Sequence, residues 1–351
     1  MKVGILTFHH ADNYGAVLQS YALQQVLRRL GADSAFVAMP TKPQATPNPV
    51  VAQRFAAFSN RIKAEQEKRS AHFAQFRQEH LSISKLYQQN DLEALVQDYD
   101  LFLAGSDQVW NVQIPDTDPR YFLPFAPGEK RCSYAASFGS AQIPEKVAPW
   151  CARQLEQFRS LSVREESGRA IIQQLTGRDC AVCLDPTLLL EQEEWEELVH
   201  PVEKEPYLLA FFLNYDAEGV ARANTLAQER GLKLRVVTAG FVPQLGFEPW
   251  SGTGVEDWLS LIYHAQGVVT NSFHGTVFSI LFERPLCVVP LGGELAGRNG
   301  RMEELLDKTG MMDCMNGTLA APDYAQVKKR LERLKAGSLE YLRGVLKDSA
   351  N

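Results

Sequence analysis

Residues 2–39 read KVGILTFHHADNYGAVLQSYALQQVLRRLGADSAFVAM, and this stretch decides the fold. It begins with a short, apolar, β-branched run over residues 2–8, which is typical of a central strand covered on both faces. After a polar turn, apolar residues recur at helical spacing as far as Leu30, and Gly31 is a natural stop for the helix. Residues 34–39 predict a second strand. Such a β-α-β unit indicates a parallel sheet.

The same alternation continues along the chain in two sets. The first set predicts further strands at 100–104, 131–136, 161–164 and 180–184, and the second predicts strands at 207–213, 233–237, 267–270 and 286–289. Between the sets lies the acidic, proline-ending stretch EQEEWEELVHPVEKEP. We therefore expect an α/β protein with two Rossmann-like, doubly wound domains facing each other across a cleft. The expected bounds are 1–195, 205–322 and, for C-terminal helices, 323–351.

One segment interrupts the alternation. Residues 52–80 have a helical pattern and carry six Lys/Arg against three Asp/Glu, so we expect a helical insertion near 50–82. The simplest explanation is a helix that packs one face against the domain. The alternative is a role in gripping an acceptor or the membrane surface near it.

Composition narrows the function further. The 351 residues include 36 Lys+Arg and 42 Asp+Glu, so the net charge is −6, which argues against a general nucleic-acid-binding protein. The six cysteines are scattered, and the first residues lack the apolar region of a signal peptide. No apolar run approaches the length of a membrane span. We expect a cytoplasmic protein, with peripheral contact at the inner face of the membrane left open.

The polar motifs follow strands, which is where open α/β sheets bind ligands. His274 lies in NSFHG, between a predicted strand and a predicted helix. Histidine suits general acid chemistry near neutral pH, and a helix N-terminus offers N–H groups to an anion. The alternative is a histidine that only packs or caps this turn.

Six stretches together resemble the polysaccharide pyruvyl transferases: NYGAVLQSYALQQVL, GSDQVWN, SYAASFG, LSVREESG, CLDPT and VVTNSFHGTVFSI. The resemblance implies the two-domain arrangement of GT-B glycosyltransferases. It also implies transfer of a pyruvyl group from phosphoenolpyruvate to a sugar of a cell-surface polysaccharide or its lipid-linked precursor, forming a ketal and releasing phosphate. No cofactor and no metal are expected.

For the donor, the resemblance assigns residues on both domains. His274 would bind phosphoenolpyruvate and donate a proton, with Ser272 and Gly275 beside it. Arg164 would bind the carboxylate or phosphate, because arginine recognises such anions with a planar fork. A third cation is expected at Arg301, or else at Arg298. The alternatives are a surface ion pair of Arg164 with its neighbouring glutamates, and plain surface charge at Arg298 and Arg301.

The acceptor side is expected at two turns of the first domain. Asp107 is a candidate for the base that takes the proton of the sugar hydroxyl, the alternative being a helix-capping aspartate. The acceptor-binding candidates are Gln108, Trp110 and Asn111, as a shelf for a sugar ring, together with Asn13, Tyr14 and Gly15. Asp185, in CLDPT, is expected to shape the floor of the cleft.

Two other functions compete with this prediction. A nucleotide-sugar glycosyltransferase would share the architecture, although Glu294 is the only acidic residue in the loop where such an enzyme would bind ribose. A non-catalytic sugar-binding or assembly protein is the other alternative. Binding of phosphoenolpyruvate or of UDP separates the first two functions, and turnover of phosphoenolpyruvate tests the third.

Overall fold

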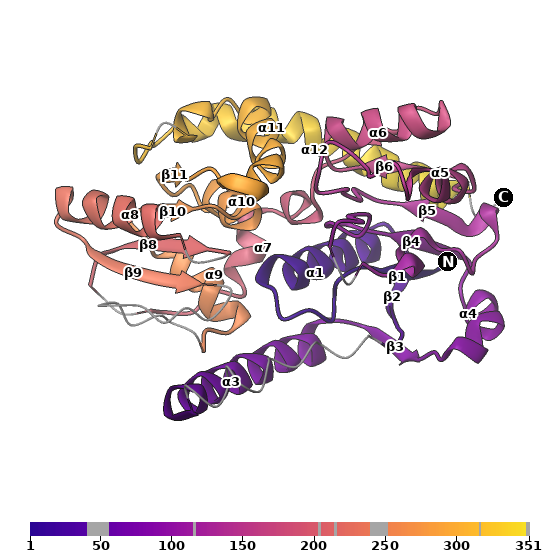
Figure 1. Ribbon diagram of the computed structural model, residues 1–351, viewed down its shortest axis with the longest axis horizontal. Helices are drawn as coiled ribbons and strands as arrows, with labels where there is room; N and C mark the ends of the chain where they lie inside the picture. Colours follow the sequence, from indigo (N-terminus) through magenta and orange to yellow (C-terminus); the bar gives the residue numbers. More distant parts are fainter. Residues whose placement is uncertain are drawn as a thin grey trace.

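The structure is a computed structural model that describes residues 1–40, 56–114, 117–202, 205–213, 216–238, 252–315 and 317–348. The described residues form a five-stranded and a four-stranded parallel sheet, each flanked by helices, together with a two-stranded parallel sheet. The chain passes from one half to the other near residue 200 (Figure 1). In the described part of the chain, no helix is both long and apolar enough to cross a membrane.

The N-terminal half is built on a five-stranded sheet in the order β3-β2-β1-β4-β5. Its strands are β1 (Lys2–Leu6), β2 (Asp33–Ala38), β3 (Ile83–Leu86), β4 (Leu101–Ala104) and β5 (Arg131–Ser133). Two short parallel strands, β6 (Ser162–Val163) and β7 (Ala181–Val182), continue this layer through single bridges to the β5 region. The strand order reverses between β1 and β4, which makes this edge a ligand-binding switch point.

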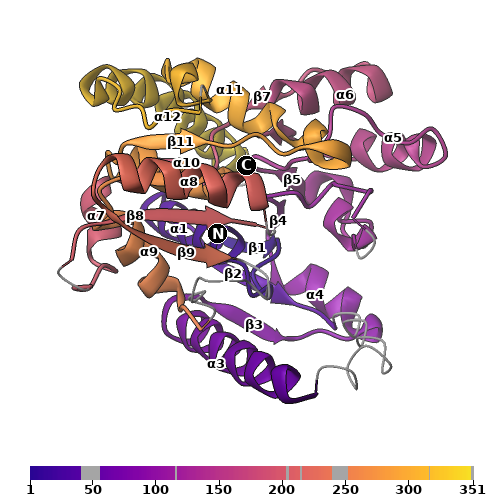
Figure 2. The same cartoon turned by 60° about the vertical axis from the view of Figure 1, so that its left-hand side comes forward.

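Six α-helices flank these strands: α1 (Tyr14–Arg29), α3 (Ala56–His80), α4 (Leu92–Asp98), α5 (Ala148–Glu156), α6 (Glu166–Thr176) and α7 (Gln192–Glu196). The predicted insertion is α3, which lies along one edge of the molecule in both views (Figures 1 and 2). Its Phe73 and Phe76 are buried in the core, as the simpler explanation of this helix requires. The pair β3 and α4 had no counterpart among the predicted elements.

The C-terminal half has a four-stranded sheet in the order β11-β10-β8-β9. Its strands are β8 (Tyr207–Phe212), β9 (Lys233–Thr238), β10 (Val268–Thr270) and β11 (Leu286–Val288), with helices α8 (Ala217–Glu229), α9 (Val255–Tyr263), α10 (Phe273–Leu281) and α11 (Gly300–Thr309). Here the order reverses between β8 and β10. Both halves are therefore doubly wound, as the alternation predicts.

The final helix, α12 (Tyr324–Lys347), returns to the N-terminal half. Ser338 accepts a hydrogen bond from Leu184 N at 2.9 Å, and the Tyr341 hydroxyl donates to Ser133 O at 2.9 Å. Arg159 Nη2 donates to Val345 O near the end of the helix. The segment predicted as one or two helices is thus one helix that connects the two halves.

Apolar packing holds the halves together. One buried cluster contains residues of α1 from the N-terminal half and of α9 and α10 from the C-terminal half. At its centre the rings of Tyr14 and Trp258 stack with centroids 5.0 Å apart, and the Tyr14 hydroxyl donates to Thr253 O at 2.9 Å. Because both rings are almost fully buried, separating the halves here would expose a large apolar area.

Candidate active site

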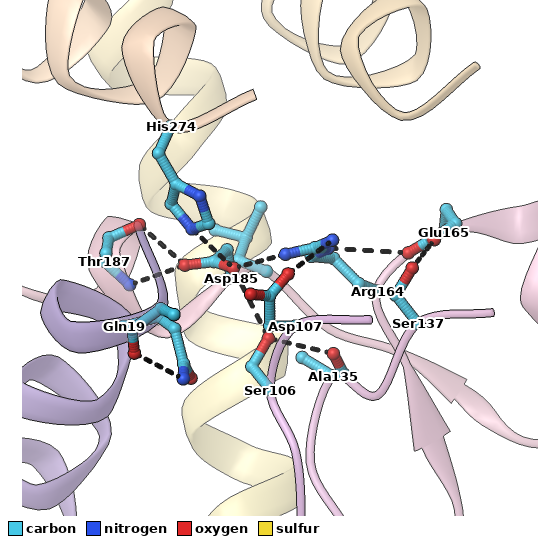
Figure 3. A network of polar contacts seen from close by, with 12 residues as sticks. Gln19, Ser106, Asp107, Ala135, Ser137, Arg164, Glu165, Asp185, Thr187 and His274 are labelled. Atoms are coloured by element: carbon cyan, nitrogen blue, oxygen red, sulfur yellow. Dashed lines mark hydrogen bonds and ion pairs between the residues drawn. The ribbon is translucent and has the colours of Figure 1, made fainter. Parts of the chain in front are cut away.

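Charged side chains from both halves converge at the carboxyl ends of the strands (Figure 3). Asp107 follows β4, Arg164 follows β6 and Asp185 follows β7, while His274 lies in the first turn of α10. All four are buried or nearly so. The sequence places Arg164 and His274 on different domains, and the structure brings both to the same carboxylate.

That carboxylate is Asp185. Its Oδ2 accepts a hydrogen bond from Arg164 Nη1 at 2.7 Å and lies 3.4 Å from His274 Nε2. The Ser106 hydroxyl donates to the same oxygen at 3.3 Å, and Oδ1 accepts from the backbone N–H and hydroxyl of Thr187. Burial alone would raise the pKa of Asp185, but His274 and Arg164 outweigh it and hold that pKa well below its usual range. Asp185 is therefore an ionised carboxylate in contact with both Arg164 and His274.

Arg164 faces three carboxylates. Besides Asp185, its Nη2 lies 3.6 Å from Asp107 Oδ1 and its Nε lies 3.6 Å from Glu165 Oε2. Burial opposes the charge of Arg164, but these carboxylates raise the guanidinium pKa above its ordinary value. Nε and Nη2 are buried and have no hydrogen-bond partner among the described residues. Such unused buried donors are costly, and they leave Arg164 able to bind an anion.

His274 is positioned by its own helix and by α1. Ser272 caps α10 by accepting from Gly275 N, so two of the predicted donor-binding residues form the turn that carries the ring. A Cβ atom built on Gly15 would lie 1.9 Å from His274 Nδ1. Gly15 therefore leaves the space that the imidazole occupies. His274 Nε2 is buried and makes no hydrogen bond with the described residues.

On the far side of Arg164, Glu165 and Arg301 complete the charge cluster. Burial raises the pKa of Glu165, against the lowering effect of the Arg164 and Arg301 charges, and Glu165 accepts a hydrogen bond from Ser137. Arg301 lies 5.9 Å from the centre of the Phe273 ring, and Arg164 lies 4.4 Å from the same ring. Both arginines line a small cavity of about 40 Å³. Of the two predicted third cations, Arg301 thus lies in the cluster, whereas the Arg298 side chain is outside the described part.

The cavity is closed by a contact between the halves. Both carboxylate oxygens of Glu304, on α11, accept from the backbone N–H of Glu166 at the N-terminus of α6, at 3.1 and 2.9 Å. Lys308 Nζ lies 2.6 Å from Glu304. A helix N-terminus favours an anion, so Glu304 fills a position of that kind.

The predicted acceptor residues lie close by, but most are used inside the protein. Trp110 is fully buried and its indole N–H donates to Tyr121 O, so neither ring face is open to a sugar. Tyr14 is equally buried against Trp258. Asn111 donates to Gln108 Oε1 at 2.8 Å, and Asn13 caps α1 by accepting from Ala16 N. The turn around Trp110 therefore supports the site through contacts inside the protein, and it offers no exposed ring face on which a sugar could stack.

Among the described residues, one group has the composition of a metal site. Ligand-type atoms of Glu79, His80 and Glu256 lie within 4.8 Å of one another, where α3 meets α9. No second feature there points to an ion. The charge cluster around Arg164 contains both signs in close contact.

For two residues of the site, the role expected from the sequence was smaller than the one that the structure indicates. Asp185 was expected to shape the cleft floor, and Gly15 to approach an acceptor. The signal for Asp185 was its place directly after a predicted strand, which it shares with Asp107 and Arg164. Gly15 has no such signal, because its role depends on a ring from the other half of the chain.

Comparisons with known proteins identify the family and the fold. A family model described as "Polysaccharide pyruvyl transferase" matches residues 13–291. Among solved structures, UDP-GlcNAc 2-epimerase from Methanocaldococcus jannaschii superposes with a TM-score of 0.50 at 12% identity, covering 95% of this chain and 92% of that one. A putative UDP-N-acetylglucosamine 2-epimerase from Listeria monocytogenes gives 0.49 at 10% identity, covering 95% and 96%.

At these identities the structural likeness shows the fold alone, and it confirms the predicted arrangement of two Rossmann-like domains, the GT-B fold. A search of curated protein sequences returns no significant match. The family model covers most of the chain, including every motif from Asn13 to His274. On this match the chain belongs to the polysaccharide pyruvyl transferases, a family of enzymes.

Proposed function

We propose that this enzyme transfers a pyruvyl group from phosphoenolpyruvate to two hydroxyls of a sugar in a cell-surface polysaccharide or its lipid-linked precursor. The products are a cyclic ketal and inorganic phosphate. The family match supports this class of reaction. The residues that would carry it out are those of the charge cluster, which combines a histidine, two arginines and three carboxylates.

Arg164 and Arg301 bind the donor in this proposal. Phosphoenolpyruvate carries a carboxylate and a phosphate on a small carbon frame, and two guanidinium groups that share one cavity suit two such anions. Ser272 and Gly275, at the N-terminus of α10, hold His274 beside them. Because the cavity is only about 40 Å³, the donor enters when the halves separate slightly and is enclosed when they close again.

The reaction begins with proton transfer from His274 to the methylene carbon of the donor. This forms a methyl group and leaves positive charge at the adjacent carbon, which a sugar hydroxyl attacks. Asp107 takes the hydroxyl proton, and the carbon–oxygen bond to the phosphate then breaks, with its electron pair leaving on phosphate. The second hydroxyl attacks the same carbon, its proton returns to the imidazole of His274, and the ketal ring closes. Asp185 Oδ2 lies 3.4 Å from His274 Nε2 and holds the ring in place for this proton transfer.

One observation carries the proposal: Arg164 is buried, charged and short of hydrogen-bond partners. Its Nη1 is held by Asp185, while Nε and Nη2 make ion pairs at 3.6 Å but no hydrogen bonds. A purely structural arginine at this depth would have its donors satisfied. Two unused donors in a cavity shared with Arg301 fit an anionic substrate.

Thermal unfolding with and without ligands tests the donor. Phosphoenolpyruvate should raise the melting temperature of the wild-type protein, and UDP should not. Arg169→Ala serves as a control for the loss of a positive charge, because it removes an exposed arginine of α6 and should keep the full shift of the melting temperature. Stabilisation by UDP without any effect of phosphoenolpyruvate would contradict the proposal and favour a nucleotide-sugar enzyme. Binding of phosphoenolpyruvate without phosphate release on any sugar would favour a non-catalytic protein.

A further inference from the structure

A second, larger pocket lies next to the charge cluster. It has a volume of about 570 Å³, within the roughly 300–1,000 Å³ typical of small-molecule sites. Its walls come from the residues after β1, the end of β2 and the segment after β4 that leads into Tyr121. These are the carboxyl ends of strands beside the point where the strand order reverses. None of the acceptor residues expected from the sequence lines it.

The pocket is connected to the proposed reaction centre. Thr7, in its wall, donates through Oγ1 to Ser106 O at 2.8 Å. The Ser106 hydroxyl in turn donates to Asp185 Oδ2, and Asp107 is the next residue along the chain. Two hydrogen bonds therefore separate the wall of this pocket from the carboxylate that holds Arg164 and His274.

The charged groups of the pocket are already paired. Arg77 Nη1 donates to Asp12 Oδ1 at 2.9 Å, and Arg120 Nε donates to Asp118 Oδ2 at 2.8 Å. Arg120 Nη2 also donates to Pro40 O. Since each arginine is paired with its own carboxylate, neither brings an unpaired positive charge to hold an anion.

The two histidines of the pocket favour a ligand rich in hydroxyls. Burial, and then the neighbouring His10, lowers the pKa of His9 to about 4, and partial burial followed by the Arg77 charge lowers the pKa of His10. His9 Nδ1 lies 3.1 Å from Thr7 O, and because a carbonyl only accepts, this nitrogen carries the proton and Nε2 is an acceptor. Neutral imidazoles both donate to and accept from hydroxyl groups.

Apolar groups complete the walls. The rings of Phe8 and Tyr121 meet edge to face at 5.1 Å, and Met39 and Ile114 lie on the same lining. Aromatic surface beside neutral hydrogen-bonding groups suits a pyranose, which has apolar faces and a polar rim.

We infer that this pocket binds the acceptor, as an uncharged hexopyranose unit whose hydroxyls are directed towards Asp107. This inference rests on the proposed function, because it names the class of acceptor for the same reaction. It replaces the turn around Trp110 as the place of the acceptor.

Saturation-transfer NMR can test the pocket with defined probes. The panel contains the methyl pyranosides of glucose, galactose, mannose and N-acetylglucosamine, and methyl glucuronide as the anionic member. Met39→Trp fills the cavity, and His10→Ala removes a polar group from its wall. The matched control is His264→Ala, a histidine at the end of α9 that does not line the pocket.

We expect saturation transfer from the wild-type protein to at least one uncharged glycoside. The signal should fall about tenfold in Met39→Trp and in His10→Ala, and it should persist in His264→Ala. No transfer to any uncharged glycoside, an unchanged signal in both pocket variants, or preference for the glucuronide would overturn the inference. If Met39→Trp does not fold, the result for His10→Ala alone decides whether the inference stands. The His10 side chain is exposed, so it can be removed without loss of core packing.

The same samples keep the two proposals apart. Melting shifts with phosphoenolpyruvate should be equal in the wild type and both pocket variants, since neither substitution touches Arg164 or His274. If the glycosides bind through the pocket and phosphoenolpyruvate does not stabilise the protein, the donor proposal fails and the sugar site stands. If phosphoenolpyruvate binds and the pocket variants bind glycosides like the wild type, the pocket inference fails and the donor proposal stands.

Discussion

The two halves of the molecule have the same architecture but end their strands in different chemistry. In the N-terminal half, the residues after β4, β6 and β7 are Asp107, Arg164 and Asp185, all charged side chains at one edge. In the C-terminal half, the turn after β10 offers Asn271 and Ser272, and both serve the backbone: Asn271 accepts from Leu213 N, and Ser272 caps α10. The proposed roles of this half fall on His274 and, from α11, on Arg301.

In the proposed reaction the two halves therefore have unequal parts. The N-terminal half supplies a fixed charge frame and the larger pocket, and the C-terminal half supplies the group that can carry a proton. Neither half holds a complete site, since His274 finds Asp185 only across the boundary between them. We therefore expect substitutions in the N-terminal half and in the C-terminal half to impair the enzyme in different ways.

The largest effect is expected from the C-terminal side. His274→Ala should reduce the transfer rate by more than about a hundredfold, because a general acid alone contributes roughly that much and donor binding would suffer as well. Phosphate release from phosphoenolpyruvate with a sugar acceptor measures it, with His264→Ala as the matched control. A His274→Ala enzyme with more than about a tenth of the wild-type rate would remove this residue from the mechanism.

The contact between the two halves can be tested at Gly15, which faces the His274 ring. A methyl group there would overlap the His274 ring, so Gly15→Ala should displace the imidazole and lower kcat by about ten- to a hundredfold. Gly337→Ala is the control, because a Cβ at that helical glycine meets no atom within 4 Å. Equal rates in the two variants would show that the position of the ring is not critical.

A smaller effect is expected from the charge frame. Arg164→Lys keeps the charge but loses the planar fork, so the KM for phosphoenolpyruvate should rise about tenfold, equivalent to roughly 1.4 kcal/mol. Arg169→Lys, on the exposed face of α6, is the control and should leave KM unchanged. If both variants have the wild-type KM, Arg164 does not contact the donor.

The smallest effect concerns stability and pH. The pKa of Asp185 in the folded protein lies below its unfolded value, so the folded state binds fewer protons and the stabilisation is lost as pH falls through the acid range below about 4. Asp185→Asn should lower the urea midpoint at pH 6 and flatten its fall towards pH 3. Asp33→Asn, at an exposed position, should follow the wild-type curve. Parallel curves for wild type and Asp185→Asn would mean that this carboxylate does not favour folding through its charge.

Much of the architecture could be predicted because the periodicity of apolar residues along the chain indicates its strands and helices. The predicted strand at 2–8 and the predicted helix that ends at Leu30 correspond to β1 and α1, and the second set of strands agrees within one residue at every end. The predicted strand at 131–136 is shorter in the structure, since β5 ends at Ser133. The helix α4 was not predicted because its seven residues are too few to show a clear helical period.

The site could be predicted only in part. Strand-end positions identified Arg164, His274 and Asp107, which lie together. Trp110 shows the limit of the method: its place in a polar turn indicated a sugar shelf, but Phe122, Phe138 and Phe158 surround the ring. The pocket beside His9 was not predicted, because its walls come from several segments that are far apart in the sequence and no single motif contains them.

The return of α12 has a consequence for how genetic damage would appear in this enzyme. A stop codon shortly after residue 322 would spare every residue to which we give a chemical role. It would nevertheless remove Ser338, whose hydroxyl accepts from Leu184 N, immediately before Asp185. It would also uncover the surface of the N-terminal half where Tyr341 bonds to Ser133. A late truncation of this kind should therefore resemble an active-site mutation in its phenotype, although the lost segment contains no catalytic side chain.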